Sequence, residues 1–381
     1  MIYLDNAATT WPKPTGVQQA MLEALNLGGN AGRGGHAASL KAQRLVHQVR
    51  EDLCRFFGTD DPTQVIFTHN ATHALNQALF GLLQPGDHVI TSSLEHNAVT
   101  RPLKVLADQG VEVTEIMVHP DQEFPWAELD QAFQGNTKLV VTVHASNVTG
   151  TLLPVEQIGR IAHRHGALYL LDASQTAGVF PLDLGQLPVD LLAFPGHKGL
   201  LGPQGTGGLI VKSKVKPLKP LLYGGTGSVS ESDEQPDFLP DALESGTLNV
   251  VGIAGLGAAM SYLKAQGLKQ IQEREQALCQ RLIDGLKEIP HLILYGGFRA
   301  SSKASIVSFN IGDLDSTFVA YTLEQTAGIV ARAGLHCAPH AHKTLGTLEQ
   351  GTVRFSPSHF TTEAEIDRTL EAVKTVARDL V

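Results

Sequence analysis

The sequence predicts an α/β protein in which helices cover both faces of a mostly parallel sheet, with a smaller α+β domain after it. Between residues 64 and 172, short apolar runs alternate with helical segments, the pattern that parallel strands and their crossover helices produce. Toward the C-terminus, fewer strand-like runs stand between longer helical segments. A length of 381 residues is ample for two or three domains, and no repeat of about 20–50 residues indicates a solenoid.

Composition and charge exclude several classes of protein. The net charge of −9 argues against a nucleic-acid surface and against a basic membrane-binding patch. No apolar run reaches about 18 residues, so no transmembrane helix is expected, and the N-terminus lacks the pattern of a signal peptide. The three cysteines, Cys54, Cys279 and Cys337, form no CxxC pair. So few free thiols indicate a reducing, cytoplasmic environment.

The first half of the chain contains most of the expected elements. Residues 1–35 are rich in glycine, asparagine and proline and are expected to form an arm with one short helix near 17–27. Apolar residues at helical spacing predict a longer helix over 39–57. Strands are then expected at 65–67, 88–91, 111–118, 139–144 and 167–172, and helices at 71–83, 96–109, 126–133 and 155–165.

A glycine-rich stretch at residues 189–210 organises the chain. An apolar run ends at Pro195, His197 and Lys198 follow, and a series of glycines precedes the next apolar run. The pattern is typical of a strand, a tight turn and a second strand, with Lys198 held at the turn. An ordinary hairpin with a solvated lysine and a lysine that faces a pocket are both consistent with this stretch alone.

The second half begins with a long glycine-, serine- and acid-rich loop at 223–247, and such loops are usually functional or mobile. One long helical region is expected over 250–288, followed by strands at 306–310 and 352–355 and helices at 317–327 and 362–380. The expected division is an arm (1–35) that packs with the small domain, a large domain (36–260) and a small α+β domain (261–381) that carries Cys337 and Arg354.

Polar residues follow the ends of the predicted strands. They occupy positions 68–72, 92–97, 145–147, 172–175 and 197–198. In doubly wound sheets, ligands bind beyond the carboxyl ends of the strands, so all of these groups are expected to open into one crevice.

These groups fit pyridoxal 5'-phosphate (PLP), which requires a lysine for its Schiff base, an acid beside its ring nitrogen and donors for its phosphate. Lys198 supplies the amine and Asp172 the acid, while Thr72 lies at a helix N-terminus that offers N–H groups and a hydroxyl. At about 3 Å and an effective dielectric near 20, Asp172 attracts a protonated ring nitrogen by roughly 5 kcal/mol. Asp172 or Thr72 alone is equally typical of a helix cap. The prediction of a PLP site therefore depends on the combination of these residues with Lys198.

The chain resembles the class V aminotransferase family over nearly its whole length, and within it the group II cysteine desulfurases and the related selenocysteine lyases. The blocks that carry the resemblance are YLDNAATT, SSLEHNAV, HASNVTG, DASQTAG, FPGHKGLLGPQG, LESGTLN, RAGLHCAP and GTVRFS. The resemblance implies the PLP-dependent transferase fold of type I, with a mostly parallel seven-stranded sheet in a large PLP-binding domain and a smaller α+β C-terminal domain.

The resemblance also implies a role for each cofactor-binding residue. Lys198 would form the Schiff base, His96 would stack on the ring and Asp172 would pair with the ring nitrogen. The remaining contacts are expected from Asn147 and Gln175 near the ring oxygen, and from Ala71, Thr72 and His197 at the phosphate. Thr247, in LESGT, resembles the residue that reaches the phosphate of a neighbouring subunit, which implies a homodimer with shared active sites.

Arg354, in GTVRFS, resembles the arginine that grips the substrate carboxylate, and a planar guanidinium suits such a bidentate contact. Arg332 and Asn147 are the other expected substrate-binding residues. Without the resemblance, a surface ion pair is an equally reasonable interpretation of Arg354.

Cys337 lies in the polar stretch RAGLHCAPHAHKTLG, whereas Cys54 and Cys279 lie in apolar helical segments and are expected to be buried. Nearby positive charge is expected to favour the Cys337 thiolate over its usual pKa near 8.5. The expected sources of that charge are His336, Arg332 and Lys343.

A zinc site is the alternative interpretation of the same stretch, because histidine and cysteine are zinc ligands. The candidate ligands are His336, Cys337, His340 and His342. The segment is short for aiming four side chains at one ion, and no metal is expected.

The implied activity is PLP-dependent cysteine desulfuration, which converts L-cysteine to L-alanine and passes sulfur as a persulfide to Cys337, then to an acceptor protein or thiol. Lys198, Cys337 and His96 are the expected catalytic residues. The rival interpretations are a selenocysteine lyase, a cysteine sulfinate desulfinase, another class V aminotransferase reaction, or a non-catalytic PLP-binding scaffold subunit.

The sequence departs from the family pattern at several positions. Pro195 replaces a serine that usually contacts the phosphate, and Leu335 replaces the first of two histidines before the cysteine. Phe360 and Thr361 replace the usual Tyr-Asn, and the chain begins directly at the YLDNAATT block, without the leading helix common in group II enzymes.

Overall fold

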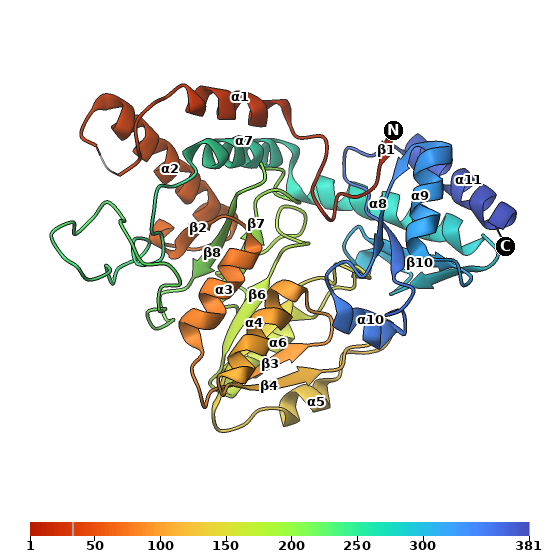
Figure 1. The fold of residues 1–381 in the computed structure, drawn as a ribbon, viewed down its shortest axis with the longest axis horizontal. Helices are drawn as coiled ribbons and strands as arrows, with labels where there is room; N and C mark the ends of the chain where they lie inside the picture. The colour runs from red at the N-terminus through yellow and green to blue at the C-terminus, as the bar shows by residue number, and fades with distance from the viewer. Residues whose placement is uncertain (33, 381) are drawn as a thin grey trace.

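The computed structural model describes residues 1–32 and 34–380, and its largest sheet has seven strands in the order β2-β8-β7-β6-β5-β3-β4 (Figure 1). The strands are β2 (Val65–Thr68), β3 (His88–Ser92), β4 (Glu112–Ile116), β5 (Thr137–Val143), β6 (Leu168–Asp172), β7 (Leu191–Pro195) and β8 (Gly207–Val211). Neighbouring strands in the series β7-β6-β5-β3-β4 pair in parallel, while β8 is antiparallel to both of its neighbours, β2 and β7. The predicted mostly parallel, seven-stranded sheet is confirmed.

Helices cover both faces of this sheet because side chains alternate along each strand between two separate cores. In β6, Tyr169 and Leu171 belong to one core and Leu170 to the other. The helices that contribute most residues to the first core are α2 (Ala37–Phe56), α5 (Trp126–Gln131), α6 (Val155–Arg164) and α7 (Val250–Gln266). The helices of the second core are α3 (Ala71–Leu82) and α4 (Asn97–Asp108).

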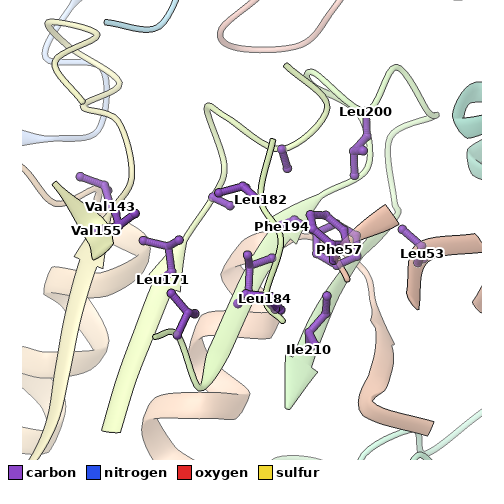
Figure 2. Packing of buried hydrophobic residues seen from close by; sticks show 14 of the residues in the cluster. Leu53, Phe57, Val143, Val155, Leu171, Leu182, Leu184, Phe194, Leu200 and Ile210 are labelled. Atoms are coloured by element: carbon purple, nitrogen blue, oxygen red, sulfur yellow. The ribbon is translucent and has the colours of Figure 1, made fainter. Parts of the chain in front are cut away.

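The first core holds β7 in place beneath Lys198. Figure 2 shows Leu53 and Phe57, at the end of α2, beside Phe194 of β7 and Ile210 of β8. The ring centroids of Phe57 and Phe194 lie 5.0 Å apart, and both side chains are fully buried. Each buried aromatic ring contributes roughly 1.5–3 kcal/mol, so the strand that leads into the lysine turn is firmly packed.

A third core surrounds a four-stranded antiparallel sheet in the order β12-β13-β10-β9. The strands are β9 (Leu292–Tyr295), β10 (Val307–Ile311), β12 (Arg332–Gly334) and β13 (Thr352–Phe355). The helices are α8 (Leu268–Lys287), α9 (Ser316–Ala327), α10 (Pro339–Leu345) and α11 (Glu363–Leu380), and short 3₁₀ turns occur at Pro62–Gln64 and Ala300–Ser302. In Figure 1 this smaller unit lies beside the large sheet, with the N-terminus next to it.

The structure differs from the expectation in the region 250–288. One continuous helical region was expected, but two helices are present, α7 and α8. They are separated at Gly267, whose φ of +82° lies outside the right-handed helical region. Helical segments lie directly on both sides of this glycine, which is why the sequence pattern was interpreted as one helical region.

The N-terminal 25 residues contact both units. Strand β1 (Ile2–Tyr3) pairs with β11 (Ile329–Val330) in the smaller unit. Helix α1 (Thr15–Leu25) packs instead against α7, where Met21 meets Gly255. None of the helices in residues 1–32 and 34–380 combines the length and apolar character that crossing a membrane requires.

A buried ion pair fixes the end of the 223–247 loop. Glu244 accepts hydrogen bonds from Nη1 and Nη2 of Arg50 in α2, each at 2.8 Å, and from the backbone N–H of Phe67 at 2.6 Å. The two side chains are only 8% and 5% exposed. The guanidinium also lies 4.6 Å from the centre of the Phe67 ring. Both carboxylate oxygens of Glu244 therefore accept a hydrogen bond from the charged guanidinium.

Glu244→Gln is expected to lower the free energy of unfolding by about 3–5 kcal/mol, because it leaves the buried Arg50 cation without a counter-charge. Urea denaturation monitored by circular dichroism measures the loss. Asp367→Asn is the control, since it breaks the exposed Arg281–Asp367 pair and is expected to cost far less. Equal losses in the two variants would contradict the expectation.

Candidate active site

A pocket of about 240 Å³ opens at the carboxyl ends of the parallel strands, facing the smaller unit. It brings together all but one of the predicted site residues. Those that line it are Ala71, Thr72, His96, Asn147, Asp172, Gln175, His197, Lys198, Arg332, Cys337 and Arg354. They come from positions as far apart in the sequence as Ala71 and Arg354, so the fold creates the cluster.

Thr247 is the predicted residue that does not line this pocket. It is exposed, and its hydroxyl accepts a hydrogen bond from Nδ2 of Asn30 at 3.4 Å. It borders a different, small hollow together with His69 and Gly205. Within a single chain, Thr247 therefore contributes nothing to the pocket around Lys198.

Lys198 lies directly after β7, in the turn between β7 and β8. The antiparallel β7–β8 hairpin is present, and the lysine at its turn is half-buried in the pocket rather than solvated. Burial and, after it, the positive charge of Arg354 lower the pKa of Lys198 to about 8, while the negative charge of Asp172 opposes the shift. A substantial fraction of neutral, nucleophilic amine is therefore present near neutral pH.

Asp172 ends β6 and is 3% exposed. Its Oδ1 accepts hydrogen bonds from the backbone N–H of Ser174 at 2.9 Å and from the Ser174 hydroxyl. Burial raises the pKa of the carboxyl, while these hydrogen bonds and the charge of Lys198 oppose the rise. A turn rather than a helix follows Asp172, so its carboxylate caps a turn and still lines the pocket.

The N-terminus of α3 forms one end of the pocket. Asn70 caps the helix, and its Oδ1 accepts from the His73 N–H at 2.9 Å. The N–H groups of Ala71 and Thr72 lie in the first turn, where no helical carbonyl is available to them. Strand β8 passes so close that a Cβ on Gly207 would lie 2.9 Å from the Asn70 backbone. These free donors make an anion site of the kind found at helix N-termini.

Two neutral histidines border the pocket. The Nδ1 atom of His96 accepts from the Ala98 N–H at 3.0 Å, which places the ring hydrogen on Nε2. Burial lowers the pKa of His96 to about 4, with the charge of Lys198 as the next cause. Burial likewise lowers the pKa of His197 to about 4, and its Nδ1 has no hydrogen-bond partner among the described residues.

Cys337 is exposed, and its loop is held in one conformation by the large unit. The Cys337 carbonyl accepts from the Asn97 N–H at 2.7 Å, and the His336 carbonyl accepts from Nδ2 of Asn147 at 2.7 Å. His336 and Cys337 have φ values of +49° and +59°, in the left-handed region. Side chains rarely adopt such angles except where surrounding contacts enforce them, and they concentrate at functional sites.

Arg332 is the cation that reaches the Cys337 thiol, with Nη2 3.7 Å from Sγ. The expectation that His336 also supplies positive charge is wrong. Its ring is buried and faces Thr352, with Nε2 3.1 Å from both the carbonyl and the hydroxyl oxygen. Burial and the charge of Arg354 lower its pKa to about 2, so the ring is neutral. Lys343 is exposed on α10.

The alternative zinc ligands also point to other partners. His340 pairs with Glu115, and Nδ1 of His342 lies 2.8 Å from the Thr347 hydroxyl. Across residues 1–32 and 34–380, no three His, Cys, Asp or Glu side chains are grouped so that they could hold a metal ion.

Arg354, in β13, is 1% exposed, so it makes a buried rather than a surface ion pair. Its Nη2 lies 3.0 Å from Oδ1 of Asp5, and its Nη1 donates to the Asn147 carbonyl at 2.8 Å. Its Nε has no partner among the described residues. Burial lowers the pKa of Arg354 to about 10, against the charge of Asp5. Asp5 was not among the predicted site residues, although it lies in the YLDNAATT block.

Glu95 is a second residue that the sequence analysis missed. It is fully buried next to His96, and its Oε1 accepts from the Ser92 hydroxyl at 2.5 Å and the Val143 N–H at 3.0 Å. Its Oε2 is buried without a partner among the described residues. Burial raises the pKa of Glu95 to about 8, and the charge of Asp172 adds to the rise. A neutral carboxylic acid therefore lies under the pocket at neutral pH.

Glu95→Gln is expected to remove a pH-dependent loss of stability. Because the folded-state pKa is about 8 and the unfolded value 4.5, the folded state holds the extra proton between these values. Wild-type stability therefore falls as pH rises through this window, by up to about 1.4 kcal/mol per pH unit relative to the glutamine variant. Urea denaturation at about pH 5 and about pH 8 measures the divergence. The control Glu112→Gln changes an exposed carboxylate, and identical pH profiles for all three proteins would contradict the expectation.

The likeness of this chain to known proteins is extensive. The family model described as aminotransferase class-V matches residues 2–369. A probable cysteine desulfurase of Methanothermobacter thermautotrophicus is 37% identical over 382 residues, covering 99% of this chain and 94% of that protein. The cysteine desulfurase of Escherichia coli O157:H7 is 33% identical over 389 residues, covering 99% of this chain and 92% of that protein.

Solved structures show the same likeness. The apo cysteine desulfurase of Thermococcus onnurineus NA1 superposes with a TM-score of 0.93 at 32% identity, covering 100% of this chain and 95% of that chain. A cysteine desulfurase of Escherichia coli superposes with a TM-score of 0.89 at 29% identity, again covering 100% and 95%.

Proposed function

The chain belongs to the aminotransferase class-V family, and from this premise we propose that its pocket is the active site of a PLP-dependent cysteine desulfurase. One observation carries the proposal. A lysine with a lowered pKa, a buried aspartate, a buried arginine and an exposed cysteine line the same pocket. Each of these groups has a separate task in removing sulfur from an amino acid.

The residues present fit PLP. Asp172 would pair with the ring nitrogen, the neutral ring of His96 would lie on the ring face, and Lys198 would supply the amine. The free N–H groups of Ala71 and Thr72, with the Thr72 hydroxyl and His197, would hold the phosphate. The other proposed contacts, to the ring oxygen, come from Asn147 and Gln175. The unpartnered Oδ1 of Asn147 and Nδ1 of His197 support the fit, since buried polar atoms ordinarily have partners.

When bound, PLP supplies an electron sink for the carbon atom that loses a proton. Lys198 is suited to remove that proton from the substrate, because a pKa of about 8 balances a neutral fraction against basicity near neutral pH. The negative charge of Asp172 would favour the protonated, positively charged form of the ring nitrogen.

Cys337 accepts the sulfur. Its thiolate forms a bond to the substrate sulfur, and the sulfur–carbon bond of the substrate breaks. The electron pair of the broken bond goes to the carbon, which takes up the proton that the substrate thiol loses, so alanine leaves and Cys337 holds a persulfide. Arg332, whose Nη2 lies 3.7 Å from Sγ, is the cation in contact with the sulfur that begins this step.

Arg354 and Arg332 would bind the substrate carboxylate, with Asn147 beside them. The unpartnered Nε of Arg354 is the donor available to a carboxylate while Asp5 and the Asn147 carbonyl hold the two Nη atoms. Burial strengthens such a charge-assisted contact.

The active unit is proposed to be a homodimer. Thr247 is exposed and does not line the pocket of its own chain, as expected for a residue that reaches the phosphate in a second copy. The exposure of Cys337 suits delivery of the persulfide sulfur to an acceptor protein or a small thiol.

A cysteine assay that follows two products together tests the proposal. PLP-loaded protein given L-cysteine without an acceptor thiol is expected to form one alanine for each persulfide on Cys337 in the first turnover. Parallel rates on selenocysteine and cysteine sulfinate define the substrate preference. Alanine without persulfide would refute sulfur transfer through Cys337, and the absence of any turnover on all three substrates would refute the enzyme assignment.

A further inference from the structure

The N-terminal segment 5–13, which we call the crossbar, links the part of the active site in the smaller unit to the part in the large unit. At one end, Oδ1 of Asp5 accepts from Nη2 of Arg354 at 3.0 Å. In its middle, the Ala7 carbonyl accepts from Nε2 of Gln175 at 3.2 Å. The crossbar therefore contacts the arginine of the smaller unit and a pocket residue of the large unit.

The crossbar is anchored on the strand that carries Arg354. Nδ2 of Asn6 donates to the Ser356 carbonyl at 2.9 Å, and the Ala7 N–H donates to the Ser356 hydroxyl at 2.9 Å. Asn6, Ala7 and Ser356 are all buried. This end of the crossbar is consequently fixed relative to Arg354.

The other end converges on the carbonyl oxygen of His197, which directly precedes Lys198. Nζ of Lys13 donates to this oxygen at 2.7 Å, and the backbone N–H of Thr10 donates to it at 3.2 Å. The Thr10 hydroxyl lies 3.1 Å from the carbonyl oxygens of both His197 and Lys198. Lys13 also donates to that hydroxyl, at 2.6 Å. The shortest of the contacts to the His197 carbonyl is thus the charge-assisted one.

Lys13 is an unusual residue to find at this place. It is half-buried, and none of the ion pairs among residues 1–32 and 34–380 includes it. Burial lowers its pKa to about 8. A lysine without a counter-charge normally extends its amine into water. Because the Lys13 amine instead lies against a backbone carbonyl, we infer that this contact has a role of its own.

We propose that Lys13, together with Thr10, is a positioning residue that fixes the backbone at 197–198 and thereby sets the Lys198 amine relative to Arg354 through the crossbar. This inference rests on the proposed function, because it takes Lys198 as the amine that captures PLP. In that capture the neutral amine condenses with the cofactor aldehyde and releases one water.

The rate at which apo-protein captures PLP, followed by the change in cofactor absorbance, tests the inference without any substrate. Lys13→Met keeps the length of the side chain and removes its donors, so capture is expected to slow about tenfold, the effect of one charge-assisted hydrogen bond. Lys13→Arg retains a donor at the end of the side chain and is expected to restore most of the rate. Lys41→Met, at an exposed lysine of α2, is the control and is expected to match the wild type.

Thr10→Val provides an independent variant should Lys13→Met fail to fold, and it is expected to slow capture as well. A wild-type capture rate in a folded Lys13→Met or Thr10→Val protein overturns the inference alone. If Lys13→Arg captures PLP as slowly as Lys13→Met, Lys13 has a merely structural role, and this result also overturns the inference. A wild-type protein that captures no PLP overturns the proposed function and this inference together.

Discussion

Lys198→Ala is expected to abolish covalent PLP binding and to lower cysteine turnover by at least about 10⁴-fold, because it removes the residue proposed as both covalent anchor and general base. The lysine is the only amine among the residues that line the pocket in the described chain. No neighbouring side chain can therefore replace its chemistry. Borohydride reduction followed by mass spectrometry measures the first effect, since it fixes PLP to the wild-type protein.

Lys198→Arg is the matched variant. It keeps a positive charge opposite Asp172 but cannot condense with an aldehyde, so it separates the electrostatic effect from the chemical one. Both variants are expected to be equally inactive, while Lys198→Arg retains more PLP by non-covalent binding. Turnover within about tenfold of the wild type in either variant would show that Lys198 is not the catalytic amine.

Cys337→Ser is expected to lower sulfur release by at least about 10³-fold while leaving cysteine binding within a few-fold of the wild-type value. A serine hydroxyl does not ionise near neutral pH and cannot hold a persulfide. The carboxylate and cofactor contacts proposed above do not involve the cysteine sulfur, so binding should survive. Alanine production, persulfide labelling and the spectral change on adding cysteine together measure the two effects.

Cys54→Ala is the control for this second experiment. Cys54 is a buried thiol whose sulfur contacts the Thr59 carbonyl, remote from the pocket lining. Its loss is expected to reduce stability but to leave persulfide labelling intact. Normal alanine and sulfide production by Cys337→Ser would place the sulfur acceptor elsewhere.

Local sequence patterns predicted the strands whose ends build the pocket, because each strand is a short apolar run followed by a polar group. Lys198 and Asp172 were predictable for this reason, since a buried strand fixes where its end lies. The break at Gly267 was not, because helical segments lie directly on both sides of it, with only this glycine between them.

Contacts made by residues distant in sequence were beyond prediction. Glu95 reads as an ordinary polar residue beside His96, and its burial depends on β3 lying next to β5. The orientation of His336 toward Thr352 depends on pairing within the smaller sheet. Asp5 and Lys13 lie in an apparently irregular N-terminal stretch whose partners are hundreds of residues away.

The alternation of side chains along β6 limits which changes of chain length the protein can tolerate. Leu170 and Leu171 face opposite cores, and Asp172 follows them at the pocket. Deleting or inserting one residue within this strand would reverse the direction of every side chain beyond it and turn the carboxylate away from its site. Natural insertions and deletions should therefore accumulate in exposed stretches such as 230–234, and be purged from 168–172.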